Sequence, residues 1–162
     1  MASLTREQTT KRIFATVEVV LCLVMVATFA SLSLSGGGLS QEALSESFAQ
    51  NPASALVLLA GCAQAFIAYV LRILHRRYEA GDTGQVVANL IALLCAEMLL
   101  KSMAGVVAMA VLLWRTWRRG ADGLADWQSS RGAGGVLVDL SVSIAVLVLA
   151  AICFAAGLRL GA

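Results

Sequence analysis

Four long apolar stretches, separated by polar segments, make up most of this chain. They cover residues 13–34, 53–74, 86–114 and 136–160. Each is as long as the roughly 20 apolar residues that a helix needs to cross the hydrocarbon core of a bilayer. The pattern predicts an all-α integral membrane protein, a single domain built as a bundle of four transmembrane helices.

The composition agrees with this class and leaves little for a soluble domain. Hydrophobic residues make up 59% of the 162 positions and charged residues only 14%. The polar segments between the apolar stretches are too short to bury a core of their own. In one of them Leu39, Ala43, Leu44 and Phe48 recur at helical spacing, which predicts a short helix on the membrane surface.

The first apolar stretch has two interpretations. Lys11 and Arg12 precede it and small residues follow it, as in a secretory signal. However, its apolar run is longer than a usual signal core and contains Glu18. We therefore expect a helix that is retained.

Basic residues predict the orientation, since they favour the cytoplasmic side. The N-terminal head and the linker after the second stretch are basic, whereas linker 35–52 has no Lys or Arg, so the N-terminus is expected in the cytoplasm. Four crossings put both termini there, but they leave a basic third linker outside. A re-entrant third stretch, broken near Lys101 to Gly105, removes this conflict and places the C-terminus outside. The third-linker residues concerned are Arg115, Arg118, Arg119 and Arg131.

The third stretch carries a carboxyl and an amine near its middle. Residues four apart share a helix face, so Glu97 and Lys101 are expected to pair. An ionised group at mid-bilayer is unfavourable by roughly 3 kcal/mol, and this face should therefore point into protein. With Asn89 and Gly105 it predicts a polar, small-residue packing surface.

The other stretches carry matching residues. Gly61 and Ala65 have the spacing that lets helices approach closely, with Gln64 beside them. Asp139, Ser143 and Gly157 provide polar and small positions in the last stretch. Three arginines at the end of the second stretch are predicted to contact lipid headgroups: Arg72, Arg76 and Arg77.

Two functions compete on this evidence. Glu18, Glu97, Lys101 and Asp139 either line a path for protons, ions or a small solute, or hold helices together inside the bundle and against a partner. No internal duplication of the kind found in transporters is present. The sequence favours a non-enzymatic accessory or regulatory subunit that packs with itself or with a larger membrane protein, and a small channel or transporter component is the alternative.

Other chemistry has little support in the sequence. The four cysteines fall one per stretch, at positions 22, 62, 95 and 153, and none forms a C-x-x-C pair. His75 is the only histidine. We expect no metal, no cofactor and no catalytic residues, and the net charge of +2 gives no reason to expect nucleic acid as a partner.

Two segments resemble a known family. "LRILHRRYEAGDTGQVVANLIAL", residues 71–93, and "ICFAAGLRLGA", residues 152–162, are similar to segments in a family of small bacterial four-helix membrane proteins of unknown function. In that family a basic helix end leads through a Gly-Asp turn into the third helix. The resemblance implies the inner membrane of a bacterium and a signalling or regulatory role.

Overall fold

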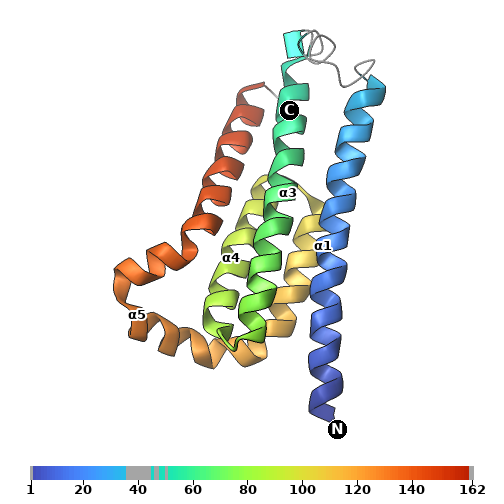
Figure 1. Cartoon of the computed structure of the whole chain (residues 1–162). Coiled ribbons are helices and arrows are strands. Elements are labelled where there is room, and N and C mark those ends of the chain that lie inside the picture. The colour runs from blue at the N-terminus through green and yellow to red at the C-terminus, as the bar shows by residue number, and fades with distance from the viewer. Residues whose placement is uncertain (1, 36–44, 46–47, 50, 161–162) are drawn as a thin grey trace.

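The computed structural model describes residues 2–35, 45, 48–49 and 51–160. Four long helices contain most of them: α1 (Ala2–Ser35), α3 (Pro52–Glu79), α4 (Thr83–Leu99) and α5 (Met103–Leu160). The all-α class is confirmed for this part of the chain (Figure 1). Of the predicted surface helix, Leu39, Ala43 and Leu44 lie outside the described residues.

Three helices are long and apolar enough to cross a membrane. They are Gln8–Leu34, Pro52–Glu79 and Gly134–Leu160. They contain three of the four predicted stretches, 13–34, 53–74 and 136–160, which supports a membrane protein. Two shorter apolar helices, Thr83–Leu99 and Met103–Trp117, stand where the third crossing was predicted, over residues 86–114.

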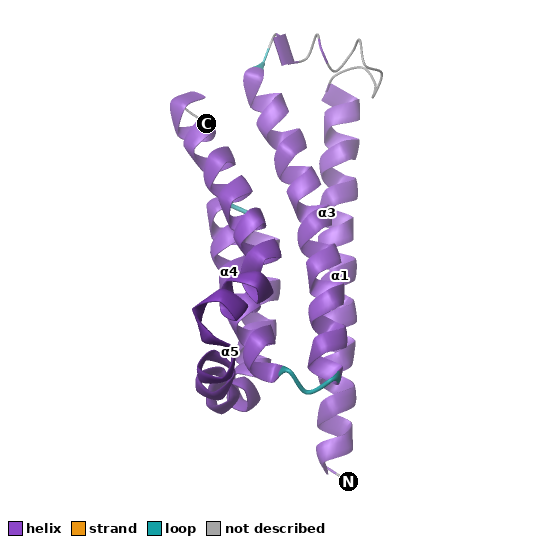
Figure 2. Ribbon diagram, turned by 60° about the vertical axis from the view of Figure 1, so that its left-hand side comes forward, coloured by secondary structure: helices purple, strands orange, loops and turns teal. Residues whose placement is uncertain are grey.

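Helices α1 and α3 form an antiparallel pair along their length (Figure 2). At one end Lys11 Nζ lies 2.7 Å from Glu79 Oε1, and the Phe14 ring stacks on His75 with centroids 5.0 Å apart. Toward the other end Gly61 meets α1 closely: a Cβ there would lie 3.0 Å from the Thr28 methyl group. The pair is therefore held by an ion pair, a ring stack and a close backbone approach.

The continuous helix predicted over residues 86–114 is wrong. Helix α4 ends at Leu99, and α5 begins at Met103. Lys101 takes a left-handed conformation with φ 56°. The backbone N–H of Lys101 donates to Met98 O and that of Ser102 to Glu97 O, each at 3.2 Å. These two bonds form a Schellman motif, which caps the helix and reverses the chain.

The two helices that meet at Lys101 form an antiparallel hairpin, the arrangement that a re-entrant segment requires. Helix α4 starts beside the end of α3, runs part of the way along the bundle, and α5 returns to the same end (Figure 1). This is the alternative that the basic third linker favoured. It places the N-terminus and the C-terminus at opposite ends of the molecule, instead of both at one end as the four-crossing prediction requires.

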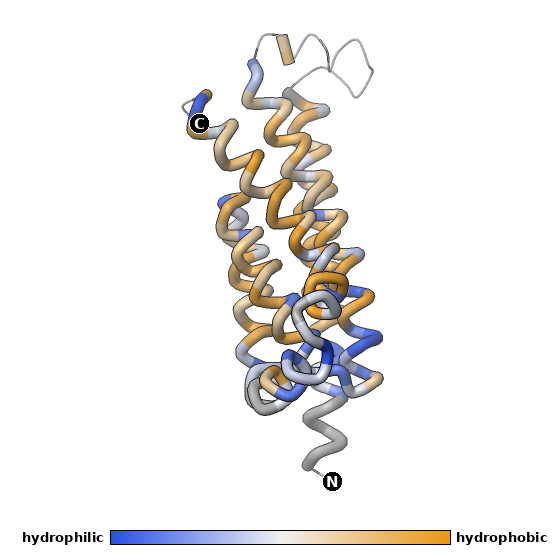
Figure 3. The backbone as a smooth tube through the Cα atoms, turned by 90° about the vertical axis from the view of Figure 1, so that its left-hand side faces the viewer, coloured by the Kyte–Doolittle hydropathy of each residue, from blue (hydrophilic) through white to orange (hydrophobic). Residues whose placement is uncertain are grey.

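Helix α5 changes direction before Gly134–Leu160, the third candidate span, which is named the last span. Gly132, with φ 63° and ψ 173°, breaks it, and a Cβ there would have no atom within 4 Å. The part of α5 between Trp117 and this break, the crossing segment, runs across the end of the bundle at which α1 begins (Figure 1). Polar residues gather at this same end, whereas the long spans are apolar (Figure 3).

Glycines bring this crossing segment against the start of α4. A Cβ on Gly84 would lie 2.4 Å from the backbone oxygen of Gly123 and 3.0 Å from the Trp127 Cβ. A Cβ on Gly120 would lie 2.3 Å from a Val87 methyl group. Backbone thus packs directly on backbone, which fixes where the chain turns toward its last span.

The hairpin predicts a topology that accessibility mapping can test. In a cysteine-free background, single cysteines at Arg12 and Ser129 are expected to react with a membrane-impermeant maleimide from the same side of the membrane. A cysteine at Arg159 is expected to react from the opposite side, because an odd number of crossings separates it from the other two. Equal labelling of positions 12 and 159 from one side would contradict the re-entrant hairpin.

Candidate functional site

One buried polar cluster lies behind the tip of the hairpin. Gln64 of α3 donates from Nε2 to Glu97 Oε2 at 2.7 Å, and the Glu97 side chain is fully buried. Gly105 of α5 packs against the same carboxyl: a Cβ there would lie 2.1 Å from Glu97 Oε2. Ser102 caps α5, its hydroxyl accepting from the Gly105 N–H at 3.2 Å. These four residues, the hairpin cluster, join α3, α4 and α5.

Lys101 does not follow Glu97 on one continuous helix. The geometry that predicted a Glu97–Lys101 pair requires one continuous helix, and the helix ends between the two residues. Lys101 is exposed, while Glu97 Oε1 is buried and has no hydrogen-bond partner within the described part of the chain. The premise of that prediction, a continuous helix, is therefore wrong, and Glu97 accepts a hydrogen bond from Gln64 of α3.

A cavity of about 210 Å³ opens beyond the hairpin tip. Leu100 and Lys101 line it at the turn, α3 contributes Ala53 and Leu56, and the last span contributes Phe154. Gly157 also lines it. The walls are mainly apolar, and Lys101 is the charged residue among those that line the cavity.

A second buried polar cluster lies nearer the end of the bundle at which α1 begins. The Ser143 hydroxyl donates to Asn89 Oδ1 at 2.6 Å, and both side chains are buried. Asn89 Nδ2 donates to the backbone oxygen of Gln85 at 2.9 Å and to that of Asp139 at 3.4 Å. This lower cluster of four residues ties α4 to the last span of α5.

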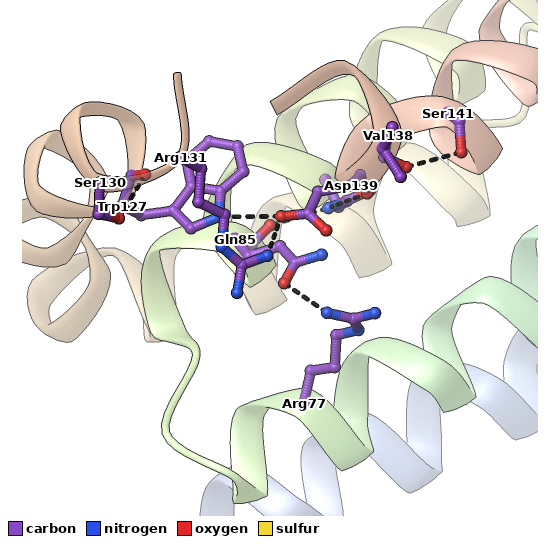
Figure 4. A network of polar contacts seen from close by, with 9 residues as sticks. Arg77, Gln85, Trp127, Ser130, Arg131, Val138, Asp139 and Ser141 are labelled. Carbon is purple, nitrogen blue, oxygen red and sulfur yellow. Dashed lines mark hydrogen bonds and ion pairs between the residues drawn. The ribbon is translucent and has the colours of Figure 1, made fainter. Parts of the chain in front are cut away.

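Charged and aromatic groups extend the lower cluster toward solvent. Arg77 Nη1 donates to Gln85 Oε1 at 2.7 Å. Asp139 forms an ion pair with Arg131 and accepts from Trp127 Nε1 at 3.4 Å (Figure 4). The carboxyl is thus held from the crossing segment of α5, at the point where this segment joins the last span.

An apolar layer separates the two clusters. Glu97 and Asn89 are eight residues apart on α4, or about 12 Å along the helix. Leu90 and Leu93 fill the interior between them, together with Ile67 and Leu71 of α3 and Met109 of α5, all fully or almost fully buried. The polar groups therefore form two separate clusters within an apolar core.

The remaining predicted residues occupy different places. Ala65 is half-buried in α3, and a Cβ on Gly157 would meet Leu56 only at 3.9 Å, an ordinary contact. Glu18 is half-buried and, with Arg72 and Arg76, lines a groove between α1 and α3. Of the three arginines predicted to contact headgroups, two therefore line this groove, whereas Arg77 contacts Gln85 in the lower cluster.

Sequence reasoning did not identify several residues that build these clusters. Gln64 was placed beside a packing motif but not opposite Glu97, and Gln85 and Trp127 had no assigned partner. A serine after the Leu99–Lys101 segment was a usable signal, because serine is a common first cap of a helix. It points to a new helix with Ser102 as its N-cap.

The arrangement offers no set of metal ligands within the described ranges. No group of three or more His, Cys, Asp or Glu side chains lies close enough there to hold a metal ion. Cys22, Cys62 and Cys95 are exposed on the helix surfaces, and Cys153 is buried. What the site does hold is carboxyl, amide and hydroxyl groups in mutual contact.

Comparison of the chain with protein-family models, with curated proteins and with solved structures found no match.

Proposed function

We propose that this chain is a non-enzymatic subunit of a membrane assembly, which packs with itself or with a larger membrane protein. The observation that carries the proposal is the apolar layer between the two polar clusters. The Gln64–Glu97 and Ser143–Asn89 contacts each join different helices. Leucine side chains close the space between them. Polar groups used in this way stabilise a scaffold and do not form a continuous path within one chain.

The small interior supports the same proposal. Only 17% of the most apolar window of the first candidate span and 22% of that of the last are buried within the chain. Their outer faces therefore meet lipid or another protein over most of their surface. Packing against a second membrane protein needs no further change of conformation to reach these faces.

The basic residues support a cytoplasmic N-terminus. Arg12, Arg76 and Arg131 come from three different segments, and the hairpin brings all three segments to one end, whereas Arg159 lies at the other. The positive-inside rule then applies to every linker without conflict. Together with the family resemblance, this favours the inner membrane of a bacterium.

A small channel or transporter component is the second candidate, favoured by the broken helix. Helix ends that meet inside the membrane are typical of ion and substrate sites in transporters. Here the Lys101 turn faces a cavity, and Glu97 lies one helical turn behind it. A path would have to continue from Glu97 past the apolar layer to Asp139, so a second chain or a movement of the hairpin is required.

Crosslinking at the native thiols tests the packing proposal. Cys22, Cys62 and Cys95 are exposed on three helices. We expect a bifunctional maleimide, added to isolated membranes, to convert a large share of the chain into a homodimer or into one heterologous adduct of fixed size. Single replacements by alanine then identify the packing face, and replacement of the buried Cys153 serves as the control. A chain that stays monomeric with all three thiols modified would contradict the proposal.

A flux measurement separates the two candidates. For the purified chain in proteoliposomes, we expect proton and sodium flux no greater than in empty vesicles. Flux that Glu97→Gln abolishes, and that Glu18→Gln leaves intact, would instead establish the second candidate.

A further inference from the structure

A groove of about 670 Å³ runs between α1 and α3 in the half of the bundle nearer the N-terminus. It lies on the outside of the antiparallel pair and not in the polar clusters. Its lining changes along its length, from charged residues near the Lys11–Glu79 ion pair to apolar residues of α1 farther along. The groove therefore has a charged end and an apolar end, and the line between these ends runs parallel to the long helices.

The apolar part of the groove is one face of α1. Val19, Leu23 and Val26 follow the i, i+4, i+7 spacing and are 57%, 61% and 58% exposed. They extend about 10 Å along the helix. This is comparable with half the thickness of the hydrocarbon core, about 15 Å. The face therefore has a suitable length to contact the part of a lipid acyl chain nearest the headgroup, with the chain parallel to the helix.

The charged part of the groove favours an anion. Arg72 and Arg76 are four residues apart on α3, exposed, and both line the groove. Glu79 is engaged by Lys11 at 2.7 Å, so its charge is already balanced. The remaining charged residues of the lining are Glu18 and these two arginines, so a single negative charge on a ligand completes the balance. Two guanidinium groups one turn apart can hold a phosphodiester from two sides.

We propose that this groove binds one anionic phospholipid. Its phosphate lies between Arg72 and Arg76, and one acyl chain lies along Val19, Leu23 and Val26. The charge excess at one end and the apolar face at the other are the complement of a phosphatidylglycerol molecule in the cytoplasmic leaflet. Arg77 takes no part, because its guanidinium donates to Gln85 on the opposite side of α3.

Native mass spectrometry of the full chain in detergent tests this site. Dioleoyl-phosphatidylglycerol and dioleoyl-phosphatidylcholine are added separately at equal concentrations. We expect one phosphatidylglycerol molecule to be retained, and an Arg72→Gln/Arg76→Gln variant to bind it about 30-fold more weakly, given the contribution of each basic residue at an anionic headgroup. Arg12→Gln, which removes an exposed charge outside the groove at the same end, should bind as the wild type does.

A second variant tests the apolar part without changing charge. Leu23→Trp places a large ring across the α1 face at an exposed position, where the fold tolerates it, and should also lower phosphatidylglycerol retention. Equal retention of the two lipids, or the same loss in Arg12→Gln as in the double variant, would show general attraction to the basic end and overturn the site. A homodimer that the double variant dissociates would assign the groove to a second protein and overturn it as well.

Discussion

Gly84→Ala is expected to destabilise the protein by about 3 kcal/mol, at the upper end of the range for overpacking in a well-packed core. The new methyl carbon would lie 2.4 Å from the Gly123 backbone oxygen and 2.8 Å from its carbonyl carbon. These are backbone atoms, which cannot rotate away as a flexible side chain does. Either α4 or the crossing segment of α5 must shift, and this shift would also disturb the Trp127–Asp139 contact.

The measurement is the free energy of unfolding in detergent micelles, from titration with sodium dodecyl sulfate. Gly134→Ala is the matched control, because a Cβ there has no atom within 4 Å and the residue is helical. The control should be neutral or stabilising by up to about 1 kcal/mol, from helix propensity alone. Similar losses in the two variants would show that helix packing against Gly123 does not hold this end of the bundle together.

The apolar pattern predicted the long helices well, because a membrane span needs only length and low polarity to be recognised. Residues 13–34, 53–74 and 136–160 all lie within long helices. It could not separate one long crossing from two shorter antiparallel helices. Residues 86–114 are apolar on both sides of Lys101, and both halves of a buried hairpin need such residues as much as a single span does.

The turns that end α3 and α4 show the same limit of sequence-based prediction at single residues. Helix α3 ends in a Schellman motif with Gly81 at φ 95°, the residue type that this conformation favours, so the end is readable from the sequence. Helix α4 ends in the same motif with Lys101 in the left-handed position. A lysine there carries no such signal. The spacing rule that paired Glu97 with Lys101 was correct for a helix, but the helix was absent at that point.

The polar contacts were less predictable than the helices, because they depend on how residues of different helices are aligned along the bundle axis. Glu97 was identified as a buried carboxyl from its sequence position, and the structure buries it fully. Its partner is 33 residues away on α3, at Gln64. A single sequence gives the register of residues within one helix but not the relative height of two helices, so this contact required the three-dimensional arrangement.

Replacing Gln64 is expected to have the other large effect on stability. Gln64→Met has a similar length and removes the amide that donates to Glu97 Oε2. The carboxyl then loses this hydrogen bond in a site with no exposure, and a buried polar group without a partner destabilises a fold by about 1–3 kcal/mol. Glu97→Met should also destabilise, since it leaves the Gln64 amide buried without that acceptor.

The double variant decides whether the two residues act as a pair. Gln64→Met/Glu97→Met replaces both polar groups with apolar ones of similar shape, which removes the unmatched group along with its partner. We expect it to be more stable than either single variant, with a coupling free energy of about 1–3 kcal/mol in a double-mutant cycle. The same cycle with Ser143→Ala in place of Gln64→Met is the control and should give a coupling near zero, because the Ser143 hydroxyl donates to Asn89 in the lower cluster. Additive losses at Gln64 and Glu97 would show that the contact between these two residues does not fix the hairpin against α3.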